Sequence, residues 1–345
     1  MKKVSMKDIA KELNTSITTV SFVINGKSEE MGISPATEKK VRDLISKRGF
    51  NPNSAARILR TGKSHTIGLI VEDIGNYFFG NIAKIIEIEA TKNGYNVFFS
   101  STENNDDTAK QLINKMRNSS VDGYIITATP GLKDEIMKLK TDNVPFVLID
   151  RLIPNIETNY VILDNYLGSY NLTKHLIDNG YSKIGFISIL SEMSMMMERE
   201  KGFLNAMTIA GLPVSSKSML KVQFEDTEET VIKAIKKYLQ QHPDLDALFF
   251  ATNYLGVMGI EALQKCGLKI PDDMAIVSFD DNDLFRLLTP SITVAAQPIN
   301  DIATQSIELL LRVINKEQKQ AKTEGRIIRP EIIIRDSSPK KKSKV

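Results

Sequence analysis

The sequence has few of the residues on which metal and thiol chemistry depend. Its 345 residues include one cysteine, Cys266, three histidines and no tryptophan. A single cysteine can form neither an intramolecular disulfide nor a thiolate metal cluster, and His65, His175 and His242 are not spaced as metal ligands. GxSxG, P-loop and GxGxxG motifs are also missing. We therefore expect a protein that is not an enzyme and that needs no metal and no cofactor.

Long apolar runs are missing as well. No stretch reaches the roughly 18 apolar residues that a membrane-spanning helix needs. Charged residues interrupt the first 12 positions, where a signal peptide would carry its apolar segment. We expect a cytoplasmic protein without a membrane partner.

Positive charge is concentrated near the N-terminus. Residues 1–63 contain 13 Lys and Arg against 6 Asp and Glu, a net charge of +7, although the whole chain carries only +3. Residues 64–338 contain 28 basic and 36 acidic residues, a net charge of −8, and the last seven residues add four lysines. A basic segment joined to an acidic body predicts that the N-terminal segment alone binds a polyanion.

The first 50 residues carry the signals of three short helices. The expected helices cover residues 6–13, residues 17–24 and a stretch that begins at position 35. Capping residues mark the starts, and a glycine marks the last end: Ser5, Ser16, Ser34-Pro35 and Gly49. Two helices joined by a tight turn and surrounded by positive charge favour a DNA-binding helix-turn-helix. A three-helix bundle used for protein contacts remains the alternative.

The second of these helices has two different faces. Val20, Val23 and Ile24 form an apolar arc that can pack on the other helices. The opposite arc is free to face outward and consists of Ile17, Thr18, Ser21 and Phe22.

From residue 64 onward, strand-like and helix-like segments alternate. Short β-rich runs occupy residues 66–71, 95–100, 124–127, 145–149, 183–189, 219–224, 247–251 and 275–279. Amphipathic stretches such as residues 78–93 and 108–118 separate them. Repeated strand–helix units predict parallel sheets with helices on both faces. Two such sets, broken near residues 150–165, predict two lobes with a cleft between them.

Polar side chains follow several of these strands. Asp150, Asn253 and Asp280 each come at a strand end, and Arg199 lies near the start of a helix. Ligands of open α/β sheets bind beyond the carboxyl ends of the strands. Carboxylates, an amide and a guanidinium suit a polyol, since each can bridge neighbouring hydroxyl groups. The alternative is that each strand-end residue only caps the next helix.

The amino-acid sequence resembles those of the LacI/GalR family of bacterial transcriptional repressors. The N-terminal blocks VSMKDIAKELNTSITTVSFVING and ATEKKVRDLISKRGFNPNSAARILRTGKSHTIGLIV are similar to that family. In the body the similar blocks include VPFVLIDR, REKGF, FFATNYLGVMG and VSFDDNDLFRLLTPSITVAAQP. The resemblance implies a helix-turn-helix head and a two-lobed α/β body of the periplasmic-binding-protein type.

The resemblance also implies which residues touch DNA. Base-reading positions fall on Ile17, Thr18 and Phe22, and backbone-phosphate positions on Ser5, Ser16, Thr19, Ser21, Asn25 and Thr37. Residues 51–63 alone look like an ordinary linker, because so short a helix is marginal in water. The family match implies instead a hinge helix that enters the minor groove as a pair, with the contact positions Asn53, Ala56, Arg57, Leu59 and Arg60.

Effector-binding positions are implied in the same way. They are Asn76, Phe78, Phe79, Thr127, Asp150, Met195, Arg199, Phe224, Asn253 and Asp280. The chain departs from common family residues where Phe22 replaces an arginine, Tyr77 a proline and Tyr254 an aspartate. Residues 193–197 (MSMMM) place apolar groups where polar contacts are often supplied, and the loop at residues 27–33 is longer than usual.

These features predict four regions and one function. Residues 1–50 form the DNA-binding domain, 51–63 the hinge helix, 64–338 the effector-binding and dimerisation domain, and 339–345 a disordered basic tail. We expect a homodimeric repressor on a palindromic operator, controlled by a small molecule, with a sugar inducer as the main hypothesis. A purine co-repressor and regulation by a protein partner remain alternatives, whereas the basic N-terminal segment argues against a transport-binding protein.

Overall fold

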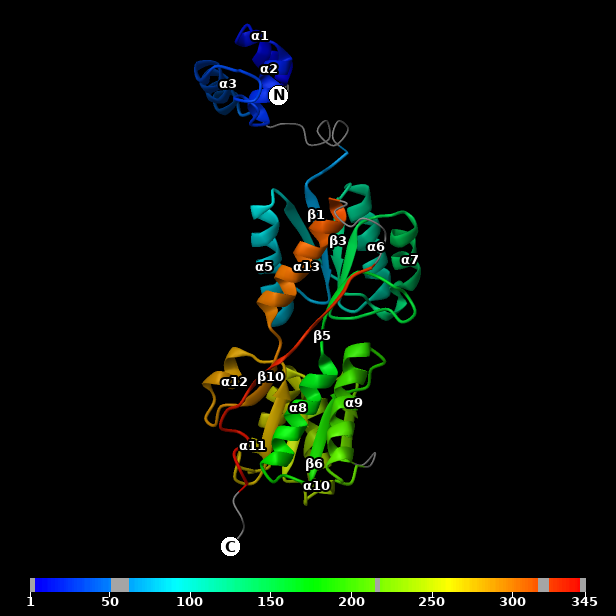
Figure 1. Ribbon diagram of the computed structural model, residues 1–345. Coiled ribbons are helices and arrows are strands. Elements are labelled where there is room, and N and C mark those ends of the chain that lie inside the picture. The colour runs from blue at the N-terminus through cyan, green and yellow to red at the C-terminus, as the bar shows by residue number, and fades with distance from the viewer. Residues whose placement is uncertain (1–3, 51–61, 215–217, 316–322, 342–345) are drawn as a thin grey trace. The chain divides into compact units, whose positions relative to one another are not determined.

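The chain forms two compact units, Met1–Ser64 and His65–Val345, which we call the head and the body and describe separately (Figure 1). The structure is a computed structural model that describes residues 4–50, 62–214, 218–315 and 323–341. No helix in these ranges is long and apolar enough to cross a membrane.

Three helices make up the described part of the head. They are α1 (Met6–Glu12), α2 (Ile17–Ile24) and α3 (Pro35–Arg48). Ser5 closes a full capping box with Asp8, and the Ser16 and Ser34 hydroxyls accept hydrogen bonds from backbone N–H groups in the first turns of α2 and α3. Gly49 ends α3 in the left-handed region at φ 58°, which glycine adopts without steric cost. The sequence predicted all three starts and this end.

The head has a small core of its own. Ile9, Val20, Val23 and Val41 are almost completely buried, and Leu44 is 8% exposed. Because α2 buries Val20 and Val23, its opposite face lies on the surface of the head.

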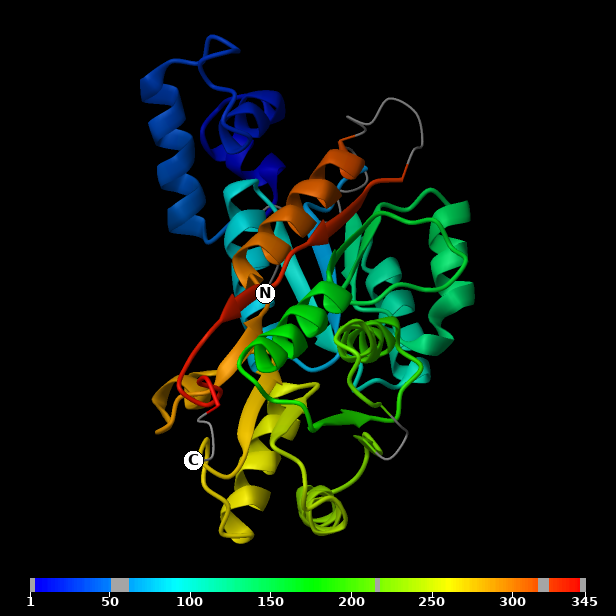
Figure 2. The same cartoon turned by 60° about the horizontal axis from the view of Figure 1, so that its bottom comes forward.

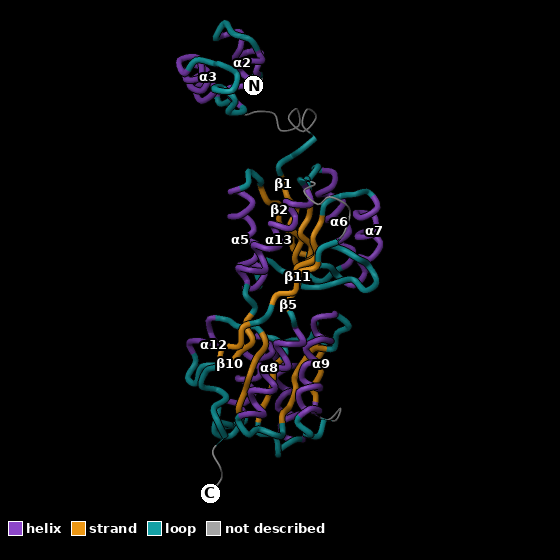
Figure 3. The backbone as a smooth tube through the Cα atoms, viewed as in Figure 1, coloured by secondary structure: helices purple, strands orange, loops and turns teal. Residues whose placement is uncertain are grey.

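The body consists of two lobes, each built on a six-stranded sheet (Figure 3). The first sheet has the order β11 (Gly325–Ile328), β5 (Tyr160–Leu163), β4 (Phe146–Ile149), β3 (Gly123–Ile126), β1 (Thr66–Val71), β2 (Asn96–Ser101). The second has the order β12 (Glu331–Ile333), β10 (Thr293–Ala296), β9 (Ala275–Phe279), β8 (Ala247–Phe250), β6 (Ile184–Ile189), β7 (Met219–Val222). Neighbours pair in parallel except β12 with β10. The two sheets therefore correspond strand for strand.

Helices cover both faces of each sheet, as the alternation predicted. Those of the first lobe are α5 (Tyr77–Lys92), α6 (Asp106–Asn118), η1 (Pro130–Leu132), α7 (Lys133–Thr141) and α13 (Ile299–Ile314). Those of the second are α8 (Asn165–Asp178), α9 (Ser194–Ile209), α10 (Glu228–Gln241), α11 (Asn253–Lys265) and α12 (Asp283–Leu287). In β3, Ile125 packs on the side of α5 and α13, while Ile126 packs on the side of α6 and α7. This two-sided burial explains why the strands read as continuous apolar runs.

The chain returns to the first lobe near its C-terminus. The sequence predicted one break near residues 150–165, and the chain does enter the second lobe at α8. It then crosses back, since α13 packs against α5 and β11 joins β5, before β12 returns to the second sheet (Figure 2). The two lobes are therefore joined by three crossings, which the linear pattern of strands did not reveal.

Residues 339–341 differ from the disordered tail that the sequence predicted. The Tyr181 hydroxyl donates a hydrogen bond to the Pro339 carbonyl at 2.9 Å. The Lys341 ammonium lies 2.6 Å from an Asp246 carboxylate oxygen. These contacts hold the segment against the second lobe. The remaining tail, residues 342–345, lies outside the described residues.

Candidate functional site

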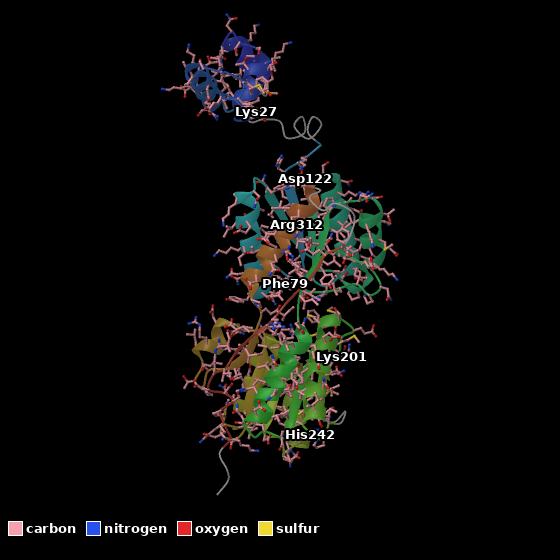
Figure 4. All side chains as sticks on the ribbon, in the orientation of Figure 1. Lys27, Phe79, Asp122, Lys201, His242 and Arg312 are labelled. Carbon is pink, nitrogen blue, oxygen red and sulfur yellow. The ribbon has the colours of Figure 1, made fainter. Side chains whose placement is uncertain are left out.

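A cavity of about 500 Å³ opens where the strands of the two lobes end at their carboxyl termini. In Figure 4, Phe79 lies beside the junction of the lobes, whereas Asp122 and His242 lie at the opposite outer ends of the body. Nine of the ten predicted effector-binding residues line the cavity: Asn76, Phe78, Phe79, Asp150, Met195, Arg199, Phe224, Asn253 and Asp280. Both lobes contribute to its wall.

Thr127 is the tenth predicted residue, and it does not line the cavity. Its side chain is 1% exposed, and its hydroxyl has no hydrogen-bond partner among the described residues. The residue follows β3 directly. Thr127 is therefore not brought together with the other nine residues.

Two aspartates hold equivalent places at the ends of equivalent strands. Asp150 follows β4, and Asp280 follows β9, the third strand in each sheet order. Both residues have φ 66°, in the left-handed region that few non-glycine residues other than Asn and Asp adopt. The same backbone turn therefore brings a carboxylate to the cavity from each lobe.

Arg199, in the second turn of α9, fixes the carboxylate of Asp280. The guanidinium is 2% exposed, and its Nη1 lies 3.0 Å from Asp280 Oδ2. It also donates to the Asn165 side chain at 2.8 Å and to the Ala251 carbonyl at 2.7 Å. The guanidinium carbon sits 3.7 Å from the centre of the Phe279 ring, which completes its surroundings. Because these contacts engage the guanidinium N–H groups, Arg199 acts mainly by holding the Asp280 carboxylate in place as a hydrogen-bond acceptor.

Gln297 adds a further donor to the same carboxylate. Its Nε2 donates to Asp280 Oδ1 at 2.6 Å. The residue lies between β10 and α13, where the chain crosses back to the first lobe. Sequence reasoning missed Gln297, because a polar residue in a connection carries no distinct signal.

A second arginine organises the first-lobe side of the cavity. Arg151 forms ion pairs with Glu72 and with Asp150, the latter at 3.1 Å, and donates to Asn104 at 2.6 Å. Its side chain is 4% exposed. One guanidinium thus serves two carboxylates, and Oδ1 of Asp150 receives no hydrogen bond within the described ranges. Arg151 was also missed, although it stands beside Asp150 in the sequence.

Burial shifts the pKa values of Asp150 and Arg151. It raises the pKa of Asp150 from 3.8 to about 7, an effect that Arg199 opposes and Asp280 reinforces across the cavity. Burial likewise lowers the pKa of Arg151 to about 10. The Asp150 side chain therefore changes between its protonated and ionised forms near neutral pH.

Aromatic and thioether side chains make up much of the remaining wall. Phe78, Tyr254 and Phe224 contribute rings, and Met193 and Met195 contribute sulfur atoms. Phe224 is 45% exposed, so one ring stands at the opening. Tyr254 lies beside Asn253 in the first turn of α11, and burial raises the pKa of its hydroxyl. Flat apolar surfaces thus alternate with fixed polar groups. The described residues hold no cluster of three His, Cys, Asp or Glu side chains fit to bind a metal ion.

The predicted DNA-contacting residues of the head lie on its surface. Ser5, Ser16, Ile17, Thr18 and Asn25 are exposed, and Thr19, Ser21, Phe22 and Thr37 are half-buried. The predicted hinge contacts Asn53, Ala56, Arg57, Leu59 and Arg60 fall outside the described residues.

Comparisons with known proteins agree with both parts of this architecture. Residues 5–53 match the model of bacterial regulatory proteins of the lacI family, and residues 64–330 match that of periplasmic binding proteins and the sugar binding domain of the LacI family. Catabolite control protein A of Priestia megaterium is 32% identical over 91% of this chain and 93% of its own. The transcriptional repressor PurR of Photobacterium profundum is 30% identical over 96% and 98%.

A solved structure supports the fold across the whole chain. The lac repressor dimer bound to operator and the anti-inducer ONPF superposes with a TM-score of 0.85, at 19% identity, over 98% of this chain and 100% of the other. A helix-turn-helix head with a two-lobed α/β body defines a class of DNA-binding transcriptional regulators, not enzymes. The chain belongs to the LacI family of bacterial regulatory proteins. The predicted family and fold class are confirmed.

Proposed function

We propose that this protein is a cytoplasmic repressor that binds a two-fold symmetric operator as a homodimer, and that a sugar bound between the lobes acts as its inducer. The observation that carries the proposal is the pair of fixed carboxylates, Asp150 and Asp280, that reaches one cavity from opposite lobes.

The chemistry of the cavity suits a polyol. Carboxylate oxygens accept hydrogen bonds from sugar hydroxyls, and the Asn253 amide can both donate and accept. The rings of Phe78 and Phe224 offer faces for the apolar side of a pyranose. A volume of about 500 Å³ is within the range of small-molecule sites. The nine lining residues predicted from the sequence are the proposed contacts.

The head supplies the proposed DNA contacts. Base contacts come from Ile17, Thr18 and Phe22, and phosphate contacts come from Ser5, Ser16, Thr19, Ser21, Asn25 and Thr37. Residues 51–63 form the proposed hinge helix, with Leu59 as the wedge between base pairs and Asn53, Ala56, Arg57 and Arg60 around it. Two heads in successive major grooves require a dimer and a palindromic site.

Coupling between the two sites follows from where the ligand binds. A ligand that touches Asp150 and Asp280 at once favours one angle between the lobes. A change in that angle alters the spacing of the paired hinges and thus the affinity for the operator. Binding of sugar and operator then oppose each other by equal factors.

The proposal is tested with the full-length protein on an operator selected from random duplexes. Fluorescence anisotropy measures operator affinity while neutral mono- and disaccharides are added. We expect one sugar to weaken operator binding, and Asn253→Ala to remove that effect. Asn93→Ala, at the exposed end of α5, is the matched control. A purine that strengthens operator binding would instead establish co-repression, and a response to no small molecule would contradict effector control.

A further inference from the structure

The outward face of α2 carries no charged side chain and no side-chain amide. Its sequence is ITTVSFVI, with neither acidic residues in its first turn nor basic residues in its last. Val20 and Val23 are completely buried, so the outward side is formed by Ile17 and Thr18 together with the half-buried Ser21 and Phe22. Ile17 is 46% exposed, so its side chain is available for contact with a partner.

The polar groups near this face are already paired with one another. The hydroxyls of Ser16 and Thr19 lie 2.8 Å apart. The Asn25 amide donates to the Ser21 carbonyl at 2.6 Å and to the Ser21 hydroxyl at 3.3 Å. No side chain of α2 can therefore make the two parallel hydrogen bonds with which a base edge is usually recognised.

Each base shows a distinct pattern in the major groove. Guanine is read by Arg or Lys, adenine by Asn or Gln, and thymine by apolar contact with its 5-methyl group. Ile17, Thr18 and Phe22 offer only methyl, methylene and ring carbons, with one hydroxyl at Thr18. We infer that α2 selects its half-site by packing Ile17 and Phe22 against thymine methyl groups, without a bidentate contact to guanine. This inference rests on the proposed insertion of α2 into the major groove.

The attraction to DNA comes from other elements of the head. Lys7 and Lys11 on α1 and Lys39, Lys40 and Lys47 on α3 form no ion pair with other described residues. Such lysines bind phosphates and carry no information on sequence. Affinity and base selection are thus divided between different helices, and the selection belongs to an apolar surface.

The test removes single methyl groups from the DNA and leaves the protein unchanged. A half-site is first selected from random duplexes with the full-length protein, and each thymine in it is then replaced by uracil. We expect a loss of about fourfold in affinity for each contacted methyl, the factor that corresponds to burying one methyl-sized group. Restoring the methyl with 5-methylcytosine, paired with guanine, should recover most of the loss. Uracil in the flanking sequence is the control.

A protein variant gives an independent measurement. Phe22→Leu keeps an apolar contact and should keep the thymine preference, whereas Phe22→Arg should shift selection toward guanine at that position. Circular dichroism establishes that both variants fold. A selected half-site that tolerates uracil at every position would overturn the inference and leave the proposed function standing. A protein that selects no sequence would remove the proposed function and the inference with it.

Discussion

Asp150 and Asp280 occupy the same position in the two lobes and reach one cavity from opposite sides. Each follows the third strand of its sheet with φ 66°. Their surroundings nevertheless differ, since Arg199 and Gln297 hold Asp280, whereas Asp150 shares Arg151 with Glu72. Both carboxylate oxygens of Asp280 therefore accept hydrogen bonds, whereas only Oδ2 of Asp150 does so among the described residues.

Removal of the Arg199 guanidinium should destabilise the body strongly. Arg199→Ala leaves Asp280 without its ion pair and frees the Asn165 and Ala251 oxygens. Breaking a buried pair from one side costs about 3–5 kcal/mol, measured as the free energy of unfolding in urea. Arg286→Ala is the control, because its pair with Asp283 is exposed, and it should change stability by less than about 0.5 kcal/mol. Equal losses in the two variants would contradict the role given to Arg199.

Stability should depend on the protonation of Asp150. The pKa of this carboxyl is about 7 in the folded protein, against the usual value of 3.8 that applies to the unfolded chain. Between these two pH values the folded state therefore binds more protons than the unfolded state. The contribution of this group therefore falls as pH rises from about 4 to 7. Asp150→Asn mimics the protonated form, and we expect it to match the parent protein near pH 4 and to exceed its stability at pH 8. Parallel pH profiles of the two proteins in urea denaturation would show that Asp150 does not titrate in this range.

Anionic ligands should bind less well than their neutral counterparts. The cavity lining contains more carboxylates than guanidiniums: Glu72, Asp106, Asp150, Glu225, Asp280 and Asp281 against Arg151 and Arg199. Both arginines already form ion pairs with carboxylates. For the sugar that binds, we expect the phosphorylated form to bind roughly tenfold or more weakly in titration calorimetry. High salt should reduce the difference in affinity between the two forms. Tighter binding of the phosphorylated sugar would contradict an excess of negative charge in the cavity.

Close packing between α8 and α9 should not tolerate a methyl group at Gly202. A Cβ there would lie 2.4 Å from the Tyr166 carbonyl oxygen and 2.9 Å from the Tyr170 nitrogen, both of which belong to the backbone. Gly202→Ala should therefore cost about 1–3 kcal/mol and displace Arg199, three residues away on the same helix. Lys201→Ala, at an exposed neighbouring site, should be near neutral. Unchanged stability in thermal and urea unfolding of Gly202→Ala would show that α9 can shift at no cost.

Local sequence signals were sufficient to predict most helices and strands and some residues of the candidate site. Caps at Ser5, Ser16 and Ser34 act within one turn, so the helices of the head could be read residue by residue. Asp150 and Asp280 stand directly after apolar strands, and their position predicted that they would face a cleft. Arg199 was singled out near the start of a helix, and the resemblance to a known family independently implied the same residue.

Contacts between distant segments could not be predicted. Arg151 pairs with Glu72, 79 positions away, and only the parallel alignment of β4 and β1 with β3 brings their ends together. Gln297 reaches Asp280 because the chain crosses between lobes after β10, and nothing in the linear pattern marks that crossing. Thr127 was implied as an effector contact by the family resemblance, yet its buried side chain does not line the cavity.

The proposed function requires that ligand binding in the cavity and operator binding by the head be coupled. The most direct test is an equilibrium titration of the full-length protein with the active sugar, with and without saturating operator. We expect operator to weaken sugar binding by the same factor by which the sugar weakens operator binding. Identical sugar affinity in the two titrations would contradict it.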